Sequence, residues 1–143
     1  MAEPIVVVSK EIIEKSEFEQ FFKGLGFDVY EDDVYDGQIS DSGGNIWFSL
    51  ESDEYLQELL MDLRGGQFSS KLDILLEKLE GDPKSLVLID IARGKESSVL
   101  AVYFAYQILL RWTCVVYDLS ERVYTSDELY LLYQQKEGFI DLY

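Results

Sequence analysis

The chain has 143 residues, with 28 acidic and 12 basic side chains, no histidine and a formal net charge of −16. Hydrophobic residues make up 48% of it and aromatic residues 14%, which excludes disorder, because disordered chains combine high charge with few aromatic residues. Without histidine there is no Ser–His or Cys–His nucleophile pair and no histidine zinc site. The single cysteine, Cys114, excludes an internal disulfide and a cysteine-cluster metal site.

The length predicts a single domain of residues 1–143. A cytoplasmic location is expected from three further observations. Residues 1–10 lack a basic region followed by an extended apolar stretch, so we expect no signal peptide. The longest apolar stretch, residues 99–110, is shorter than the ~20 residues that a membrane-spanning helix needs. Cys114 lies among apolar neighbours and is expected to be buried and reduced.

The first elements in chain order are a strand and an aromatic helix. Residues 5–8 form a β-branched run that is typical of a buried strand. A helix is expected to begin at a capping box formed by Ser16 and Glu19 and to close at Gly26. Its apolar stripe has helical spacing and consists of Phe18, Phe21, Phe22 and Leu25.

Two strands and a long turn region follow. Alternating polarity over residues 27–32 predicts a strand with one inward face. Residues 34–44 are rich in Asp-Gly and Ser-Gly-Gly turn chemistry, which favours a solvent-exposed loop. Residues 45–50 then predict a second strand.

Two leucine stripes predict a helical hairpin. The first stripe, over residues 56–63, follows Ser52, which is expected to cap the helix. The second, over residues 72–79, follows Ser69 and Ser70, either of which can serve as the cap. Glycine residues stand after each stripe and end each helix.

The last part of the chain predicts an apolar helix among strands. That helix, residues 97–112, is apolar on nearly every side and is therefore expected to be buried on two sides. A second capping box, Thr125 with Glu128, opens a final helix. The expected strands are residues 86–91, 114–117 and 123–124. This order predicts an α+β fold, a mixed β-sheet packed by about five helices around one central apolar helix.

One segment of the chain carries charge of a single sign. No Lys or Arg stands between Lys23 and Arg64. Charge of one sign focuses potential on one face, speeds encounter with a basic protein and disfavours nucleic acid and anionic lipid. The segment, here called the acidic block, contains the carboxylates of Asp28, Glu31, Asp32, Asp33, Asp36, Asp41, Glu51, Asp53, Glu54, Glu58 and Asp62.

Tyrosines within the acidic block add rigid contact area with a polar tip, which protein interfaces enrich. The alternative interpretation is that these carboxylates are a solvated surface that keeps the chain soluble. The interface hypothesis predicts a set of partner-binding residues: Asp28, Tyr30, Glu31, Asp32, Asp33, Tyr35, Asp36, Asp41, Asp53, Glu54, Tyr55 and Glu58.

Two ligand motifs fail on spacing, so no metal and no cofactor is expected. When Asp36-Gly37 is aligned with positions 5 and 6 of an EF-hand loop, Val34 and Gly43 occupy positions that need oxygen ligands. The sequence around Gly94 lacks the first glycine of a phosphate loop and has Glu96 where Ser or Thr should stand. Asp90 is the one acid within an apolar strand. We expect its carboxylate to accept hydrogen bonds, for which backbone amides are the candidate donors.

Residues 97–133 resemble bacterial toxin-immunity proteins, including those of contact-dependent growth-inhibition systems. The similarity covers about a quarter of the chain and concerns the scaffold, so it transfers no binding residue. It implies a protein without enzymatic activity that blocks one cognate toxin domain, often a basic nuclease. The residues that carry the resemblance are Leu109-Leu110-Arg111-Trp112, Val115-Val116-Tyr117-Asp118 and Val123-Tyr124-Thr125-Ser126-Asp127-Glu128-Leu129.

The leading hypothesis is an antidote that masks the basic active site of a toxin, with no direct contact to nucleic acid or membrane. Residues 28–41, with the helix over residues 52–62, are expected to form its binding surface. One alternative is a DNA-mimicking inhibitor of restriction or other nucleic-acid enzymes, whose carboxylates imitate phosphates. Another is an enzyme that uses carboxylates alone.

Overall fold

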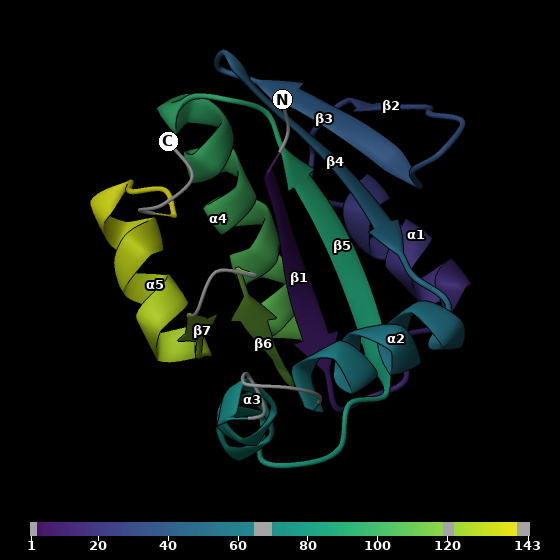
Figure 1. Ribbon diagram of the computed structural model, residues 1–143. Coiled ribbons are helices and arrows are strands. Elements are labelled where there is room, and N and C mark those ends of the chain that lie inside the picture. Colours follow the sequence, from purple (N-terminus) through teal and green to yellow (C-terminus); the bar gives the residue numbers. More distant parts are fainter. Residues whose placement is uncertain (1–2, 65–69, 119–121, 140–143) are drawn as a thin grey trace.

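The computed structural model describes residues 3–64, 70–118 and 122–139 (Figure 1). Five helices and seven strands are described in this part of the chain. In chain order they are β1 Glu3–Ser9, α1 Lys15–Lys23, β2 Val29–Tyr30, β3 Gly37–Asp41, β4 Gly44–Leu50, α2 Asp53–Arg64, α3 Ser70–Leu79, β5 Ser85–Ile91, α4 Lys95–Arg111, β6 Cys114–Tyr117, β7 Val123–Tyr124 and α5 Ser126–Gln135.

All seven strands belong to one sheet with the order β2-β3-β4-β5-β1-β6-β7. Each described pairing is antiparallel, including those of β1 with β5 and with β6. The central strands β5 and β1 are almost wholly apolar because side chains on both of their faces are covered. The predicted α+β class, with a sheet packed by about five helices, is confirmed; the sheet was expected to be mixed, and every described pairing in it is antiparallel.

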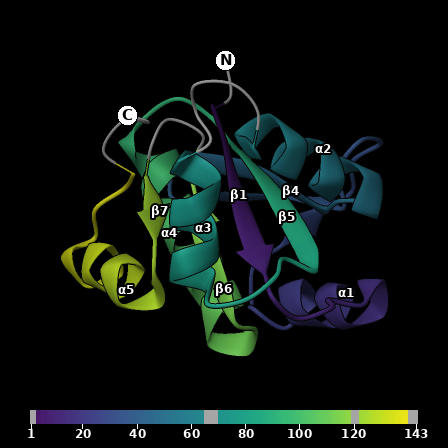
Figure 2. The ribbon, with the colours of Figure 1, turned by 60° about the horizontal axis from the view of Figure 1, so that its bottom comes forward.

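Helices cover the two faces of the sheet unequally. On one face α1 and α4 pack on side chains such as Ile5, Phe48 and Ile89. On the other face α2 and α3 pack on Val6, Val8 and neighbouring residues of β5 and β6. Figure 1 looks onto the second face, where α2 and α3 lie at the lower end of the strands and leave the arrowhead end of β5 without a helix in front of it. Figure 2 shows the two helices from below.

The predicted helix α1 forms, but its predicted caps are wrong. It begins at Lys15, with Glu14 as an N-cap whose side chain makes no capping hydrogen bond. Ser16 therefore lies inside the first turn, and Glu19 binds Lys23 instead, with 2.5 Å between Oε1 and Nζ. The helix ends at Gly24 with ordinary right-handed angles, so Gly26, at φ +88°, comes after its end.

The exposed loop predicted over residues 34–44 is also wrong, because it contains β3. Ile39 of β3 is fully buried and pairs with Ile46 across the β3–β4 hairpin. Ser42 and Gly43, at φ 52° and 86°, form its two-residue turn. Positive φ at both positions matches the twist of antiparallel strands. The strand expected over residues 27–32 is reduced to β2.

The other predicted helices agree with the structure. Ser52 Oγ accepts a hydrogen bond from the Tyr55 amide at 3.3 Å, as expected of the α2 cap. The Ser69 alternative for α3 lies outside the described residues, and α3 begins at Ser70. The α2 and α3 stripes pack together in one cluster. Helix α4 is buried between the sheet and α5, which explains its nearly uniform apolar surface.

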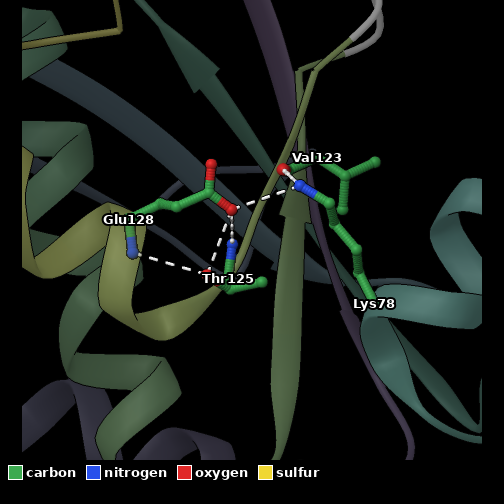
Figure 3. A network of polar contacts seen from close by, with 4 residues as sticks. All are labelled: Lys78, Val123, Thr125 and Glu128. Atoms are coloured by element: carbon green, nitrogen blue, oxygen red, sulfur yellow. Dashed lines mark hydrogen bonds and ion pairs between the residues drawn. The ribbon is translucent and has the colours of Figure 1, made fainter.

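A polar network ties α3 to β7 and α5 around the edge of the sheet (Figure 3). The predicted capping box forms: Thr125 Oγ1 accepts from the Glu128 amide, and Glu128 Oε1 accepts from the Thr125 amide. Lys78 Nζ lies 3.1 Å from the Val123 carbonyl oxygen and 3.2 Å from Glu128 Oε1. Burial raises the pKa of Glu128, but the hydrogen bonds from Thr125 and Lys78 outweigh it and lower the pKa.

Candidate interaction face

The loop between β2 and β3 is held over the open part of the sheet by hydrogen bonds. Asp32 Oδ1 accepts from the amides of Val34 and Tyr35, at 2.8 and 3.1 Å, which forms a local turn. The Tyr35 hydroxyl donates to Asp90 Oδ2 on β5. Asp36 Oδ2 accepts from the Leu50 amide at 2.7 Å. Two residues, Tyr35 and Asp36, thus anchor this loop to the sheet, while Asp32 shapes the loop from within.

A row of polar and aromatic side chains crosses the sheet beside this loop. The register pairs Tyr30 with Gln38, Gln38 with Trp47, and Trp47 with Asp90. Paired residues share a face of the sheet, and this face is opposite to the one that buries Ile39 and Phe48. None of these four side chains is buried, and Tyr30 is 51% exposed. The row therefore offers a partner aromatic rings and hydrogen-bonding groups together.

The start of α2 brings further carboxylates toward the same row. Glu51 Oε1 accepts from Ser49 Oγ at 2.6 Å, at the end of β4. Tyr55 follows one turn later, and burial raises its pKa, helped by the negative charges of Glu51, Asp90 and Glu58. Carboxylates from β5, α2 and the end of β4 thus lie close enough to Tyr55 for their charges to raise its pKa.

Tyr35 reports the same concentration of negative charge. Its pKa is raised to about 12, first because its hydroxyl donates to Asp90, then because of burial and the charges of Asp90, Asp32 and Glu51. Ionising this tyrosine would put a further negative charge among carboxylates. The neutral phenol is therefore kept as a hydrogen-bond donor.

On the other side of β2, a hollow of about 410 Å³ opens between α1 and the strand. Aromatic rings line it, among them Phe22 and Phe27. Four of the predicted binding residues line it as well: Asp28, Tyr30, Glu31 and Asp36. The acidic block thus presents two sides, the open sheet and this hollow, with β2 between them.

None of the carboxylates of the acidic block forms an ion pair within the described part of the chain. The four described ion pairs use acids from elsewhere: Glu19, Glu128, Glu137 and Glu17. Several block acids are anchored by hydrogen bonds, but no Lys or Arg of the described chain neutralises them. Uncompensated charge of this kind raises the local potential and attracts a cationic surface.

The structure does not bring every predicted residue together. Asp41 ends β3 at the β3–β4 turn, four residues from Gly37 and about 13 Å away along the strand. Asp53 and Glu54 are exposed at the start of α2, where negative charge also favours the helix terminus. Asp33 is exposed in the loop without a described hydrogen bond.

Three residues that sequence reasoning left out of the site belong to the row: Gln38, Trp47 and Asp90. Gln38 lies in the segment that the sequence predicts as a loop, and Trp47 lies in a predicted strand. Asp90 was expected to be satisfied structurally; its described partner is the Tyr35 hydroxyl, not a backbone group. Its position inside an apolar strand was the one signal in the sequence that could have drawn attention to this face.

Within the described residues, no three His, Cys, Asp or Glu side chains come together as ligands for a metal ion. None of the described helices is both long and apolar enough to pass through a membrane. In comparisons with protein-family models, curated proteins and solved structures, nothing matches the chain.

Proposed function

We propose that this protein is an immunity protein, an antidote that binds and neutralises one basic toxin domain such as a nuclease. The observation that carries the proposal is the set of acidic-block carboxylates without a cationic partner in the described chain. A complementary basic surface would supply the missing charge and would be steered to this face as it approaches.

The aromatic row favours a protein partner over imitation of DNA. Imitation of phosphates needs charge alone, whereas protein interfaces bury aromatic rings at their centre and place polar groups around them. Tyr30 and Trp47 likewise place aromatic rings in a row beside the carboxylates of the acidic block. Loop anchors such as Asp36 hold the surface in one conformation, which lowers the entropy cost of binding.

A tagged form of the protein, incubated with native bacterial lysate at moderate salt, tests the proposal. We expect one basic protein to be retained in stoichiometric amount and identified by mass spectrometry. Expression of that protein should arrest growth, and co-expression of this chain should restore it. Several DNA-binding enzymes released together as salt rises would favour the DNA mimic instead, and no retained protein would contradict both.

A charge-neutralised variant locates the surface. Glu31→Gln, Asp33→Asn and Glu58→Gln remove three exposed carboxylates for which no hydrogen bond is described. We expect slower association and weaker protection, because long-range attraction acts mainly on the association rate. The matched control neutralises three exposed carboxylates elsewhere: Glu14→Gln, Glu77→Gln and Glu80→Gln. Equal protection by the two triple variants would rule out this placement.

A further inference from the structure

Both phenylalanine rings and carboxylate residues line the hollow between α1 and β2. Phe18 and Phe22 are buried beneath it, with ring centroids 5.4 Å apart, and Phe22 lies 5.0 Å from Phe48 of β4. Phe27 is held from behind by Tyr103 of α4, in an edge-on contact at 5.5 Å. Because the core fixes each ring, the aromatic lining exists before any ligand arrives.

The charges around this hollow are unequally divided. Three carboxylate residues line it: Asp28 and Glu31, which flank β2, and Asp36, which directly precedes β3. On the α1 side Lys23 is neutralised by Glu19, at 2.5 Å, and Lys15 is exposed on the helix. Negative charge therefore prevails among the residues that line the hollow, with three carboxylates against Lys15 once Lys23 is paired.

We propose that this hollow receives an arginine side chain of the partner; the identity of that partner rests on the proposed function. A guanidinium stacks on aromatic rings, sheds water more readily than an ammonium and presents a planar fork to carboxylates. Its apolar stem matches the rings of Phe22 and Phe27. A volume of about 410 Å³ lies within the ~300–1,000 Å³ range of pockets that enclose ligands.

Titration of the ¹⁵N-labelled protein with L-argininamide, followed by amide chemical shifts, tests the inference without the partner. We expect saturable shifts over residues 22–36, with the millimolar affinity expected of so small a ligand. Citrullinamide, an analogue of similar shape in which a neutral urea replaces the guanidinium, should cause no saturable shift. Lysinamide should bind several-fold more weakly, because its ammonium neither stacks nor forms a fork.

A double variant, Asp28→Asn with Glu31→Gln, should weaken argininamide binding about fivefold, since two exposed charge pairs are lost. The matched control, Glu77→Gln with Glu80→Gln on the far side of the sheet, should bind as the parent does. Shifts spread over all acidic residues, or equal binding of lysinamide or citrullinamide, would overturn the inference.

The outcomes for hollow and function are distinguishable. If a toxin is captured from lysate and argininamide does not bind in the hollow, the inference fails and the proposed function stands. If argininamide occupies the hollow and no toxin is captured, the arginine site stands and the proposed function fails.

Discussion

The hydroxyl of Tyr35 joins the loop before β3 to Asp90 on β5, two strands away in the sheet. Tyr35→Phe removes this hydrogen bond and leaves the ring in place. We expect the free energy of unfolding at pH 7 to fall by about 1 kcal/mol, the usual net contribution of such a bond. Urea denaturation measures the change. Tyr30→Phe is the control: no hydrogen bond is described for Tyr30, and its replacement should cost less than ~0.5 kcal/mol.

The same pair predicts a dependence on alkaline pH. The pKa of Tyr35 is raised from 10 to about 12 in the folded protein, chiefly by its hydrogen bond to Asp90. Since the folded pKa lies above the unfolded one, the contribution to stability is complete below pH 10 and disappears as the pH rises through 12. The stability difference between the parent and Tyr35→Phe should therefore shrink over this interval. A constant difference would contradict the assignment.

Cys114 provides a second prediction for a single residue. Burial raises the pKa of its thiol to about 12, against a smaller opposing effect of a hydrogen bond with Ser9. Because the thiolate is the reactive species, the thiol should react with a disulfide reagent such as DTNB far more slowly in the native protein at pH 8 than in urea. Equal rates in the two states would show that Cys114 is accessible.

At the scale of elements, two similar sequence motifs have different outcomes. Thr125 caps α5 through a complete capping box, whereas Ser16 lies inside α1 and caps nothing. Thr125→Ala should cost about 1 kcal/mol, while Ser16→Ala should change the free energy of unfolding by less than ~0.5 kcal/mol. Thermal or urea denaturation of both variants measures the contrast. Equal costs would mean that the box contributes no specific stabilisation.

These two motifs also show what the sequence could predict. A capping box needs only residues three apart, so the pattern identifies candidates, but packing decides the helix start. The first hydrogen bond of α1 runs from the Phe18 amide to the Glu14 carbonyl, which places Ser16 past the cap. Long apolar runs such as α4 and β5 were predictable because burial on all sides needs no knowledge of a partner.

Strand β3 escaped prediction because its signal is short. Only Ile39 is a large apolar residue between Gly37 and Asp41, so local alternation is weak. The strand exists because the turn at Ser42 and Gly43 brings it against β4. The candidate site shares this limit: charge density was visible in the sequence, whereas the row from Tyr30 to Asp90 depends on the register of four strands.

For the whole molecule, the acidic block predicts an unusual response to salt. Like charges repel by a few tenths of a kcal/mol per exposed pair at typical separations, and salt screens them. Raising NaCl from about 0.05 to 0.5 M should therefore raise the free energy of unfolding by about 1 kcal/mol. The rise should be smaller in the variant Glu31→Gln, Asp33→Asn, Glu58→Gln than in the control Glu14→Gln, Glu77→Gln, Glu80→Gln. Identical salt responses of the two variants would show that the carboxylates of the acidic block repel one another no more than carboxylates elsewhere in the chain.

The position of β1 in the sheet bears on when the molecule can act after synthesis. Ile5 and Val7 pair with Ile89 and Val87, and on the other edge Val7 pairs with Val116. At ~5–20 residues per second a ribosome needs several seconds to supply these partners, and contacts so distant in sequence also close slowly. The β3–β4 hairpin can form early, but the acidic surface acquires its rigid base only after most of the chain has been translated. A newly started chain is therefore expected to be unready for binding, and any partner made at the same moment meets an incomplete surface.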